Sequence, residues 1–149
     1  MKNPFDDRYF MKKALQEAKS AFEKGEIPVG AVIVVEDRII ARSHNLTELL
    51  NDVTAHAEMQ AITSAANFLG GKYLKNCTLY VTMEPCQMCA GALYWSQISK
   101  VVFAAEDSER GFQVMGTKLH PKTKVKSGIL AKEASELIQR FFIEKRNLN

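Results

Sequence analysis

The chain has 149 residues, of which 46% are hydrophobic and 25% are charged, and its formal net charge is +3. This composition is that of an ordinary globular protein, and we expect one domain over residues 1–149. Because the sequence has neither an apolar stretch long enough to span a membrane nor a signal-peptide core near its start, we expect a cytoplasmic protein that does not contact membranes.

The first predicted element is an amphipathic helix over residues 8–24, because apolar residues recur there at helical spacing. Residues 25–28, which include a glycine and a proline, end this helix. The β-branched run over 29–35 predicts a buried strand. A polar tip at 36–37 then leads into a second strand over 38–43, which we expect to run antiparallel to the first.

The rest of the chain alternates helices and strands, which is typical of a sheet with parallel strands and helices on its faces. Strands are predicted over 77–82 and 100–105. Helices are predicted over 54–69, 85–96 and 131–146. The first of these helices ends at a pair of glycines, and its residues expected to be buried are Ala57, Ala61, Ile62, Ala65 and Phe68.

Two further segments have no helical pattern. Residues 106–116 read as a polar, irregular connection. Residues 118–126 alternate basic side chains with others, which indicates a fifth strand with one basic face. That face is either a solvated sheet edge, where lysines discourage edge pairing, or a contact for nucleic acid. The sequence leaves both interpretations open.

The chemistry is concentrated in two short stretches, Thr54-Ala55-His56-Ala57-Glu58 and Glu84-Pro85-Cys86-Gln87-Met88-Cys89. They supply one imidazole and two thiolates, which are ligands that Zn²⁺ prefers. A structural zinc has four protein ligands, whereas a catalytic zinc has three and leaves one position open. His56, Cys86 and Cys89 make three, so we predict a catalytic zinc site.

Helix starts are expected to place these side chains. Thr54 is a plausible N-cap, which would put His56 and Glu58 in the first turn of a helix. Pro85 suits the first position of the next helix, where the spacing of Cys86 and Cys89 puts both sulfurs on one face. The positive end of the helix also favours their negative charge.

Glu58 is the predicted catalytic residue. A zinc ion lowers the pKa of a bound water to about 7, and a carboxylate beside it can carry the proton from water to substrate. The order His-x-Glu followed by Pro-Cys-x-x-Cys matches the signature of zinc-dependent nucleobase deaminases. The prediction of a deamination reaction rests on this match.

Two other interpretations of the cysteine pair are weaker. A structural zinc would need His44, Cys77 or His120 as a fourth ligand, and it would leave Glu58 unexplained. A redox dithiol would use neither His56 nor Glu58. Cys77 by itself is expected to be a small buried residue, and three cysteines make no disulfide framework.

Across nearly its whole length the chain resembles the bacterial tRNA-specific adenosine deaminases of the cytidine deaminase superfamily. Besides the two stretches above, the resemblance rests on Ile27-Pro28-Val29-Gly30-Ala31-Val32, on Ala90-Gly91-Ala92 and on Val101-Val102-Phe103. It implies a three-layer α/β/α fold with a central five-stranded mixed sheet, and a homodimer. It also implies conversion of the wobble adenosine in a tRNA anticodon loop to inosine.

The resemblance also assigns roles to single residues. It makes His56, Cys86 and Cys89 the zinc ligands and Glu58 the proton shuttle. Four more residues match substrate contacts, each with an ordinary alternative: Asn45 (base contact or turn former), Asp107 (RNA backbone contact or loop cap), and Phe142 and Arg146 (anticodon-loop contacts, or a core aromatic and an exposed charge).

Some features depart from that family. Glu106 stands where the family often has a basic or neutral residue, and residues 111–124 look shorter than in many members. The pairs Tyr94-Trp95 and Gly111-Phe112 are similar to those of guanine deaminases, which act on a free base. A free-base or nucleoside deaminase of salvage metabolism, acting on guanine or cytosine, therefore stays an alternative, as does a non-catalytic structural zinc protein. The helix over 85–96 is a candidate dimer surface.

Overall fold

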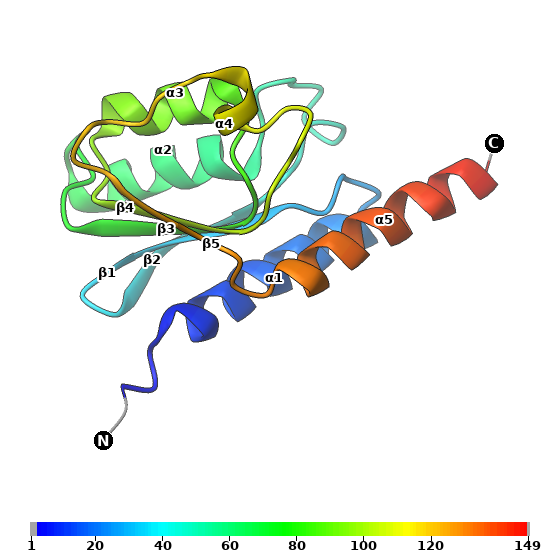
Figure 1. Ribbon diagram of the computed structural model, residues 1–149, viewed down its shortest axis with the longest axis horizontal. Helices are drawn as coiled ribbons and strands as arrows, with labels where there is room; N and C mark the ends of the chain where they lie inside the picture. Colours follow the sequence, from blue (N-terminus) through cyan, green and yellow to red (C-terminus); the bar gives the residue numbers. More distant parts are fainter. Residues whose placement is uncertain (1–2, 149) are drawn as a thin grey trace.

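A five-stranded sheet is the middle layer of the computed structural model, which describes residues 3–148 (Figure 1). The strand order is β2-β1-β3-β4-β5. Strand β1 pairs antiparallel with both β2 and β3, whereas β3–β4 and β4–β5 are parallel, so the sheet is mixed as the sequence predicts. The strands are β1 (Gly30–Val35), β2 (Arg38–His44), β3 (Cys77–Met83), β4 (Lys100–Ala105) and β5 (Lys124–Ser127).

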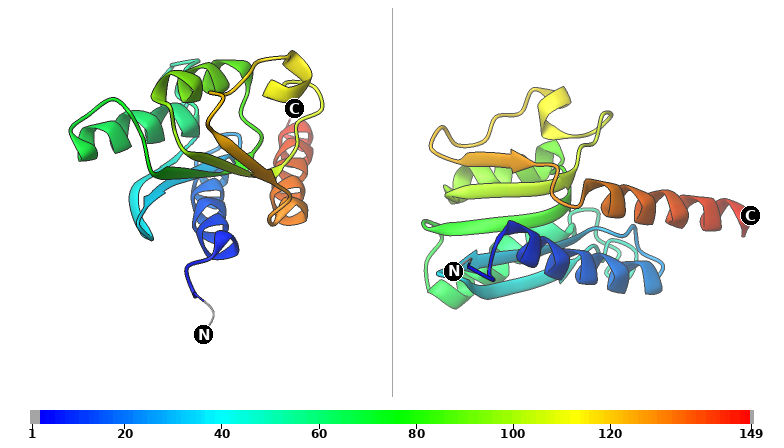
Figure 2. Two further views of the ribbon diagram at one scale, coloured as in Figure 1. Left: turned by 60° about the vertical axis from the view of Figure 1, so that its left-hand side comes forward. Right: turned by 60° about the horizontal axis from the view of Figure 1, so that its bottom comes forward.

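Helices cover both faces of the sheet (Figures 1 and 2). Helices α2 (Ala57–Leu69) and α3 (Gln87–Ser96) lie on one face, and α1 (Asp7–Glu23) and α5 (Ala131–Asn147) lie on the other. The short helix α4 (Phe112–Met115) lies beside α3. This is the three-layer α/β/α arrangement expected from the sequence.

The central strands are buried on both sides because successive side chains point to opposite faces. In β1, Ala31 and Ile33 enter the core under α2 and α3, whereas Val32 and Val34 enter the core under α1 and α5. The turn after β1 has positive φ at Glu36 (49°) and Asp37 (61°), as a two-residue hairpin requires.

Some predicted elements are wrong in detail. Phe68 is 56% exposed instead of buried, and the irregular segment 106–116 contains α4. Of the residues 118–126 predicted as a strand, only 124–126 belong to β5, and His120 lies in a loop against the Tyr94 ring. The sequence pattern overestimated this strand because pairing with β4 begins only at Lys124, opposite Lys100.

Within residues 3–148, none of the helices combines the length and the apolar character needed to cross a membrane.

Candidate metal centre

The three predicted ligands come from two helix starts on one face of the sheet. His56 is the N-cap of α2, Cys86 is the N-cap of α3, and Cys89 lies in the first turn of α3. In the described chain neither N-cap side chain makes a capping hydrogen bond. Both side chains are therefore available to a ligand, beside two helix ends whose dipoles favour thiolate charge.

The expected helix starts were therefore wrong by about half a turn. Helix α2 begins at Ala57, so Thr54 is not its N-cap; the Thr54 hydroxyl instead donates a hydrogen bond to Asp52 Oδ1 (2.7 Å). Helix α3 begins at Gln87, so Pro85 lies just outside it. The capping preference of Thr54 and the preference of proline for the first helical position favoured earlier starts. In the structure His56 and Cys86 still have an extended backbone, and the helices begin after them.

The ligand atoms have the spacing that zinc requires. His56 Nδ1 lies 3.6 Å from Cys86 Sγ and 3.5 Å from Cys89 Sγ. Zn–N bonds of about 2.05 Å and Zn–S bonds of about 2.3 Å at a tetrahedral angle would separate N and S by about 3.6 Å. Three such atoms within 4.8 Å of one another leave one vertex of a tetrahedron for a non-protein ligand. The donor set and its spacing fit Zn²⁺.

Hydrogen bonds from the side chains of two other residues fix the His56 segment. Ser43 Oγ, at the end of β2, donates to the Ala57 carbonyl (2.6 Å). Gln60 Nε2 donates to the carbonyls of His44 (2.7 Å) and Ala55 (3.1 Å). These bonds attach the start of α2 to β2, so the imidazole is held in place by the sheet and not by its own turn alone.

The thiols have opposite pKa shifts without a metal. A hydrogen bond from Cys89, and then one with His56, lowers the pKa of Cys86 to about 4. The same Cys86–Cys89 bond, together with burial, raises the pKa of Cys89 above its ordinary value. One thiolate thus exists before metal arrives, and zinc binding would deprotonate the second.

Glu58 is buried next to these ligands, with 4% of its surface exposed. Burial raises the pKa of its carboxyl group to about 7, and its partners include the thiol of Cys89. A carboxyl group with this pKa is close to half ionised at neutral pH, so it can both accept and return a proton. The structure therefore puts a carboxyl group with a raised pKa beside the predicted metal ligands, and its role as proton shuttle stays a prediction.

The structural-zinc alternative has no fourth ligand in the part of the chain that the structure describes. The metal-binding group found there contains only His56, Cys86 and Cys89. His44 instead donates from Nδ1 to Glu17 (2.9 Å) and accepts at Nε2 from the Lys24 ammonium (3.0 Å). Cys77 is a free, fully buried core residue, as predicted.

The residues predicted to bind substrate lie in the loops after β2 and β4 and on α5. Asn45 is buried after β2, donates to the Ile27 carbonyl (3.3 Å) and accepts from the Thr47 amide (3.4 Å). Asp107 follows β4, and its Oδ1 accepts from the amides of Glu109 and Arg110 (both 3.0 Å), as a loop cap does. Phe142 is 45% exposed, so it is not a core aromatic.

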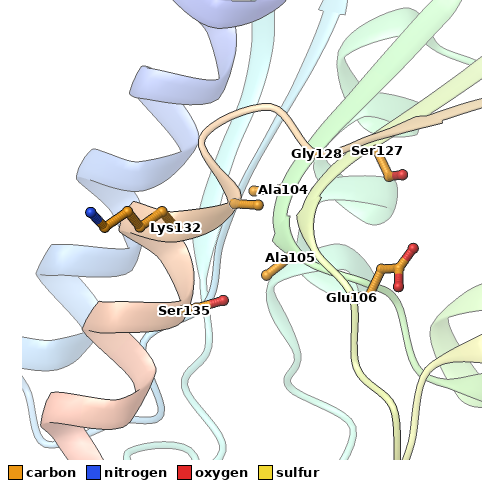
Figure 3. A pocket seen from close by; sticks show the side chains of 8 residues that line it. Ala104, Ala105, Glu106, Ser127, Gly128, Lys132 and Ser135 are labelled. Carbon is orange, nitrogen blue, oxygen red and sulfur yellow. The ribbon is translucent and has the colours of Figure 1, made fainter.

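Two cavities lie outside the metal centre. One of about 560 Å³ is an open hollow on the surface of α5, and its lining residues, which include Phe142 and Arg146, all belong to that helix. The other, of about 350 Å³, lies where β4 and β5 end beside the start of α5, with Glu106, Lys132 and Ser135 at its rim (Figure 3). None of the three zinc ligands lines either cavity.

The lysines of the basic stretch have different surroundings. Lys124 and Lys126 are on β5, at the edge of the sheet. The Lys126 ammonium binds Asp7 Oδ2 (2.7 Å), so part of the positive charge is already neutralised within the molecule.

Sequence reasoning missed two buried glutamates. Glu26 is 1% exposed and accepts from the amides of Glu48 (3.0 Å) and Leu49 (2.7 Å). Glu84 is 5% exposed and accepts from the amides of Asp107 and Gln113 (both 3.0 Å). For Glu84, the sequence contains one indication of burial: this carboxylate comes between a largely apolar strand and the Pro85-Cys86 pair.

Comparison with known proteins identifies the family. Residues 4–105 match the family described as cytidine and deoxycytidylate deaminase zinc-binding region. A tRNA-specific adenosine deaminase from Aquifex aeolicus is 51% identical over 145 residues, covering 93% of this chain and 95% of the relative. Its counterpart from Bacillus subtilis is 44% identical over 146 residues, covering 94% and 91%.

Solved structures agree with these relatives. A structure from a study of A-to-I editing by tRNA:A34 deaminases at the wobble position has a TM-score of 0.81 and 42% identity, covering 87% of this chain and 98% of that one. Guanine deaminase from Bacillus subtilis has a TM-score of 0.66 and 42% identity, covering 70% and 67%. With these matches and the zinc-binding geometry of His56, Cys86 and Cys89, the chain belongs to the tRNA-specific adenosine deaminases of the cytidine and deoxycytidylate deaminase superfamily.

Proposed function

We propose that this protein hydrolyses the wobble adenosine of a tRNA anticodon to inosine, with release of ammonia, as a single zinc-dependent deaminase domain. The observation that carries the proposal is the three-ligand centre with the buried carboxyl group of Glu58 beside it. The curated relatives named tRNA-specific adenosine deaminase, matched over more than nine-tenths of this chain, support the choice of substrate.

His56, Cys86 and Cys89 hold the metal. When bound, Zn²⁺ acts as a Lewis acid that lowers the pKa of water at its open position, so that a nucleophile for adenine C6 exists at neutral pH. Glu58 takes a proton from the attacking water and delivers it to the purine ring nitrogen N1. A second transfer through the same carboxylate protonates the amino group, which leaves as ammonia.

The pKa of Glu58 suits this double role. In the metal-free site burial raises that pKa to about 7, so this carboxyl group holds a proton more tightly than an exposed glutamate and can return it to the substrate. A fully exposed glutamate would be ionised at this pH and would return protons poorly. The apolar surroundings of the site thus set the chemistry as well as the packing.

For the substrate contacts we propose the residues that the resemblance assigns. Asn45 contacts the flipped base, Asp107 the RNA backbone, and Phe142 and Arg146 the anticodon loop. The exposure of Phe142 and Arg146 along a cavity of about 560 Å³ supports an external role for them. Asn45 and Asp107 lie in the loops after β2 and β4, next to the elements that carry the zinc ligands.

The partner that we propose for the protein itself is a second copy of the chain, in the cytoplasm, where tRNA is processed. The exposed aromatic pair on α3 supports this, because Trp95 is 77% exposed and Tyr94 is 37% exposed. Such side chains are common in subunit contacts and costly to leave in water. Sedimentation of wild type and Trp95→Ala tests the dimer, since the variant should shift toward the monomer.

The second candidate is a free-base deaminase, which the partial match to guanine deaminase favours. Ammonia release separates the two. We expect turnover with an anticodon stem-loop carrying adenosine at the wobble position, and no comparable turnover with free guanine, cytosine or cytidine. Activity on free bases alone would overturn the assignment to tRNA.

A further inference from the structure

Glu84 is a buried carboxylate to which neither the metal centre nor the proposed chemistry gives a role. It follows β3 and directly precedes the Pro85-Cys86 pair. It is 5% exposed, and its carboxylate accepts hydrogen bonds from two backbone amides in another part of the chain. Keeping a carboxylate in such a place is unfavourable unless each oxygen receives a hydrogen bond.

Both oxygens of Glu84 bind one loop. Oε1 accepts from the Asp107 amide and Oε2 accepts from the Gln113 amide, each at 3.0 Å. The two donors are the ends of the segment 107–113, which starts just after β4 and ends in the first turn of α4. One carboxylate therefore closes this segment into a fixed loop.

The loop is also attached to the segment that carries the zinc ligand Cys86. The Phe112 amide donates to the Pro85 carbonyl (2.9 Å), and Cys86 and Gly111 form an isolated antiparallel bridge. Because Glu84 is in the same segment, its bonds and these backbone contacts together set the distance between the loop and the metal ligand. A shift of the loop would move Asp107 relative to the open position of the metal.

Gly111 shows how closely the loop is fitted to this carboxylate. A Cβ atom built on Gly111 would lie 2.5 Å from each carboxylate oxygen of Glu84, closer than real Cβ contacts come. Its φ is not in the left-handed region, so glycine is needed there for space and not for backbone conformation. The Glu84 carboxylate thus occupies the space that a side chain at position 111 would need.

From this geometry we infer that Glu84 is a positioning residue, which holds the 107–113 loop beside Cys86 in the conformation that receives the substrate. The inference rests on the proposed function for its substrate, but the carboxylate-loop contact is independent of it. Glu84 touches no reacting atom. Its effect should therefore appear in substrate binding more than in the chemical step.

The first test compares Glu84→Gln with wild type in zinc-loaded enzyme on the anticodon stem-loop. The amide offers one acceptor where the loop needs two, so we expect KM to rise about tenfold while kcat changes less than about threefold. Zinc content should remain one per chain. A matched control is Tyr80→Phe, which breaks the hydrogen bond to Asp7 in the opposite core and should leave KM unchanged.

A second measurement follows the loop without any assay. Amide hydrogen exchange at Asp107 and Gln113 should accelerate at least tenfold in Glu84→Gln, with unchanged rates in β3. This readout remains valid if the wild-type enzyme prefers a free base to the stem-loop. Failure of the proposed function would appear in wild type, whereas failure of this inference would appear as unchanged exchange in the variant.

A double-mutant cycle gives the sharpest test. Gly111→Ala should raise KM in wild type, because the new Cβ displaces the carboxylate, but it should add little in the Glu84→Ala background, where that space is free. Gly71→Ala is the matched control, since a Cβ there meets nothing within 4 Å among the described residues. Unchanged KM in Glu84→Gln, or additive effects of Gly111→Ala and Glu84→Ala, would overturn the inference.

Discussion

The helices on the two faces of the sheet contribute different side chains to the core. The buried apolar residues of α2 are alanines (Ala57, Ala61 and Ala65), and the zinc ligands lie at the starts of α2 and α3. Helices α1 and α5 contribute larger side chains, such as Phe10, Met11 and Leu137, together with several alanines. Small residues let α2 and α3 pack close to the sheet and converge on the metal, while large residues bury more area per side chain.

From this difference we expect the chemistry to depend on the α2–α3 face of the sheet and the stability of the fold to depend more on the α1–α5 core. Changing Glu58 beside the metal ligands should remove activity with little loss of stability. Shortening a large side chain of the α1–α5 core should lower stability with little loss of activity.

The largest expected effect is on catalysis. Glu58→Gln keeps the shape of the side chain but cannot take up a proton, so kcat should fall by about a thousandfold. Zinc content should not change, and the thermal midpoint should stay within about 2 °C, because the substitution replaces a buried ionisable group by a neutral one. Ammonia release and metal analysis measure the two quantities. Full activity in this variant would remove Glu58 from the mechanism.

The converse experiment is on the other face. Phe10 is 2% exposed and packs against the Tyr80 ring, with 5.3 Å between the ring centroids. Phe10→Ala should lower the free energy of unfolding by about 3–5 kcal/mol, as loss of a buried aromatic does. Below the unfolding transition, kcat/KM on the stem-loop should stay within about twofold of wild type. A large loss of kcat at unchanged folding would show that the two faces are coupled.

A smaller and pH-dependent effect is expected at Asp7, which joins α1 to the sheet. Burial opposes its charged form, but hydrogen bonds from Lys126 and Tyr80 (both 2.7 Å) outweigh it and lower the pKa of Asp7. A lowered folded-state pKa gives stability that is present above the unfolded-state value of about 4 and is lost as pH falls through the folded-state value.

Asp7→Asn should therefore cost about 1–2 kcal/mol of unfolding free energy between pH 5 and 8. The difference from wild type should shrink below about pH 4, where the wild-type carboxylate becomes protonated. Urea unfolding at several pH values measures this. A difference that is constant down to pH 2 would contradict the assignment of the charge to this contact.

The smallest effect concerns the link between the sheet and the metal centre. Ser43→Ala removes the hydroxyl that donates to the Ala57 carbonyl (2.6 Å). We expect a loss of about 1 kcal/mol in stability together with a two- to fivefold lower kcat, because the start of α2 carries both His56 and Glu58. Ser20→Ala on the exposed surface of α1 is the matched control, and it should change neither quantity.

The sequence predicts those features of the structure that depend on a local pattern of residues. The helices have clear apolar periodicity, and His56, Cys86 and Cys89 belong to a motif with fixed spacing, so the helices and the clustering of these three side chains were predicted correctly. The starts of α2 and α3 were not, because Ser43 and Gln60 hold the extended residues before α2 through contacts that no local preference reveals.

The conformations of the loops around the site could not be predicted from the sequence either. Glu26 and Glu84 bind amides more than twenty residues away in the chain, and such contacts have no characteristic spacing. The strand β5 was predicted too long for a similar reason, since its extent is set by pairing with β4 and not by its own alternating pattern.

The central claim is a metal centre with three protein ligands and one open position. X-ray absorption spectroscopy of the zinc-loaded protein, combined with metal analysis, tests it most directly. We predict one zinc per chain, bound by one nitrogen of His56 and the sulfurs of Cys86 and Cys89, with a light, non-protein atom as the fourth ligand. A fourth protein ligand, or a protein that binds no zinc, would contradict this account.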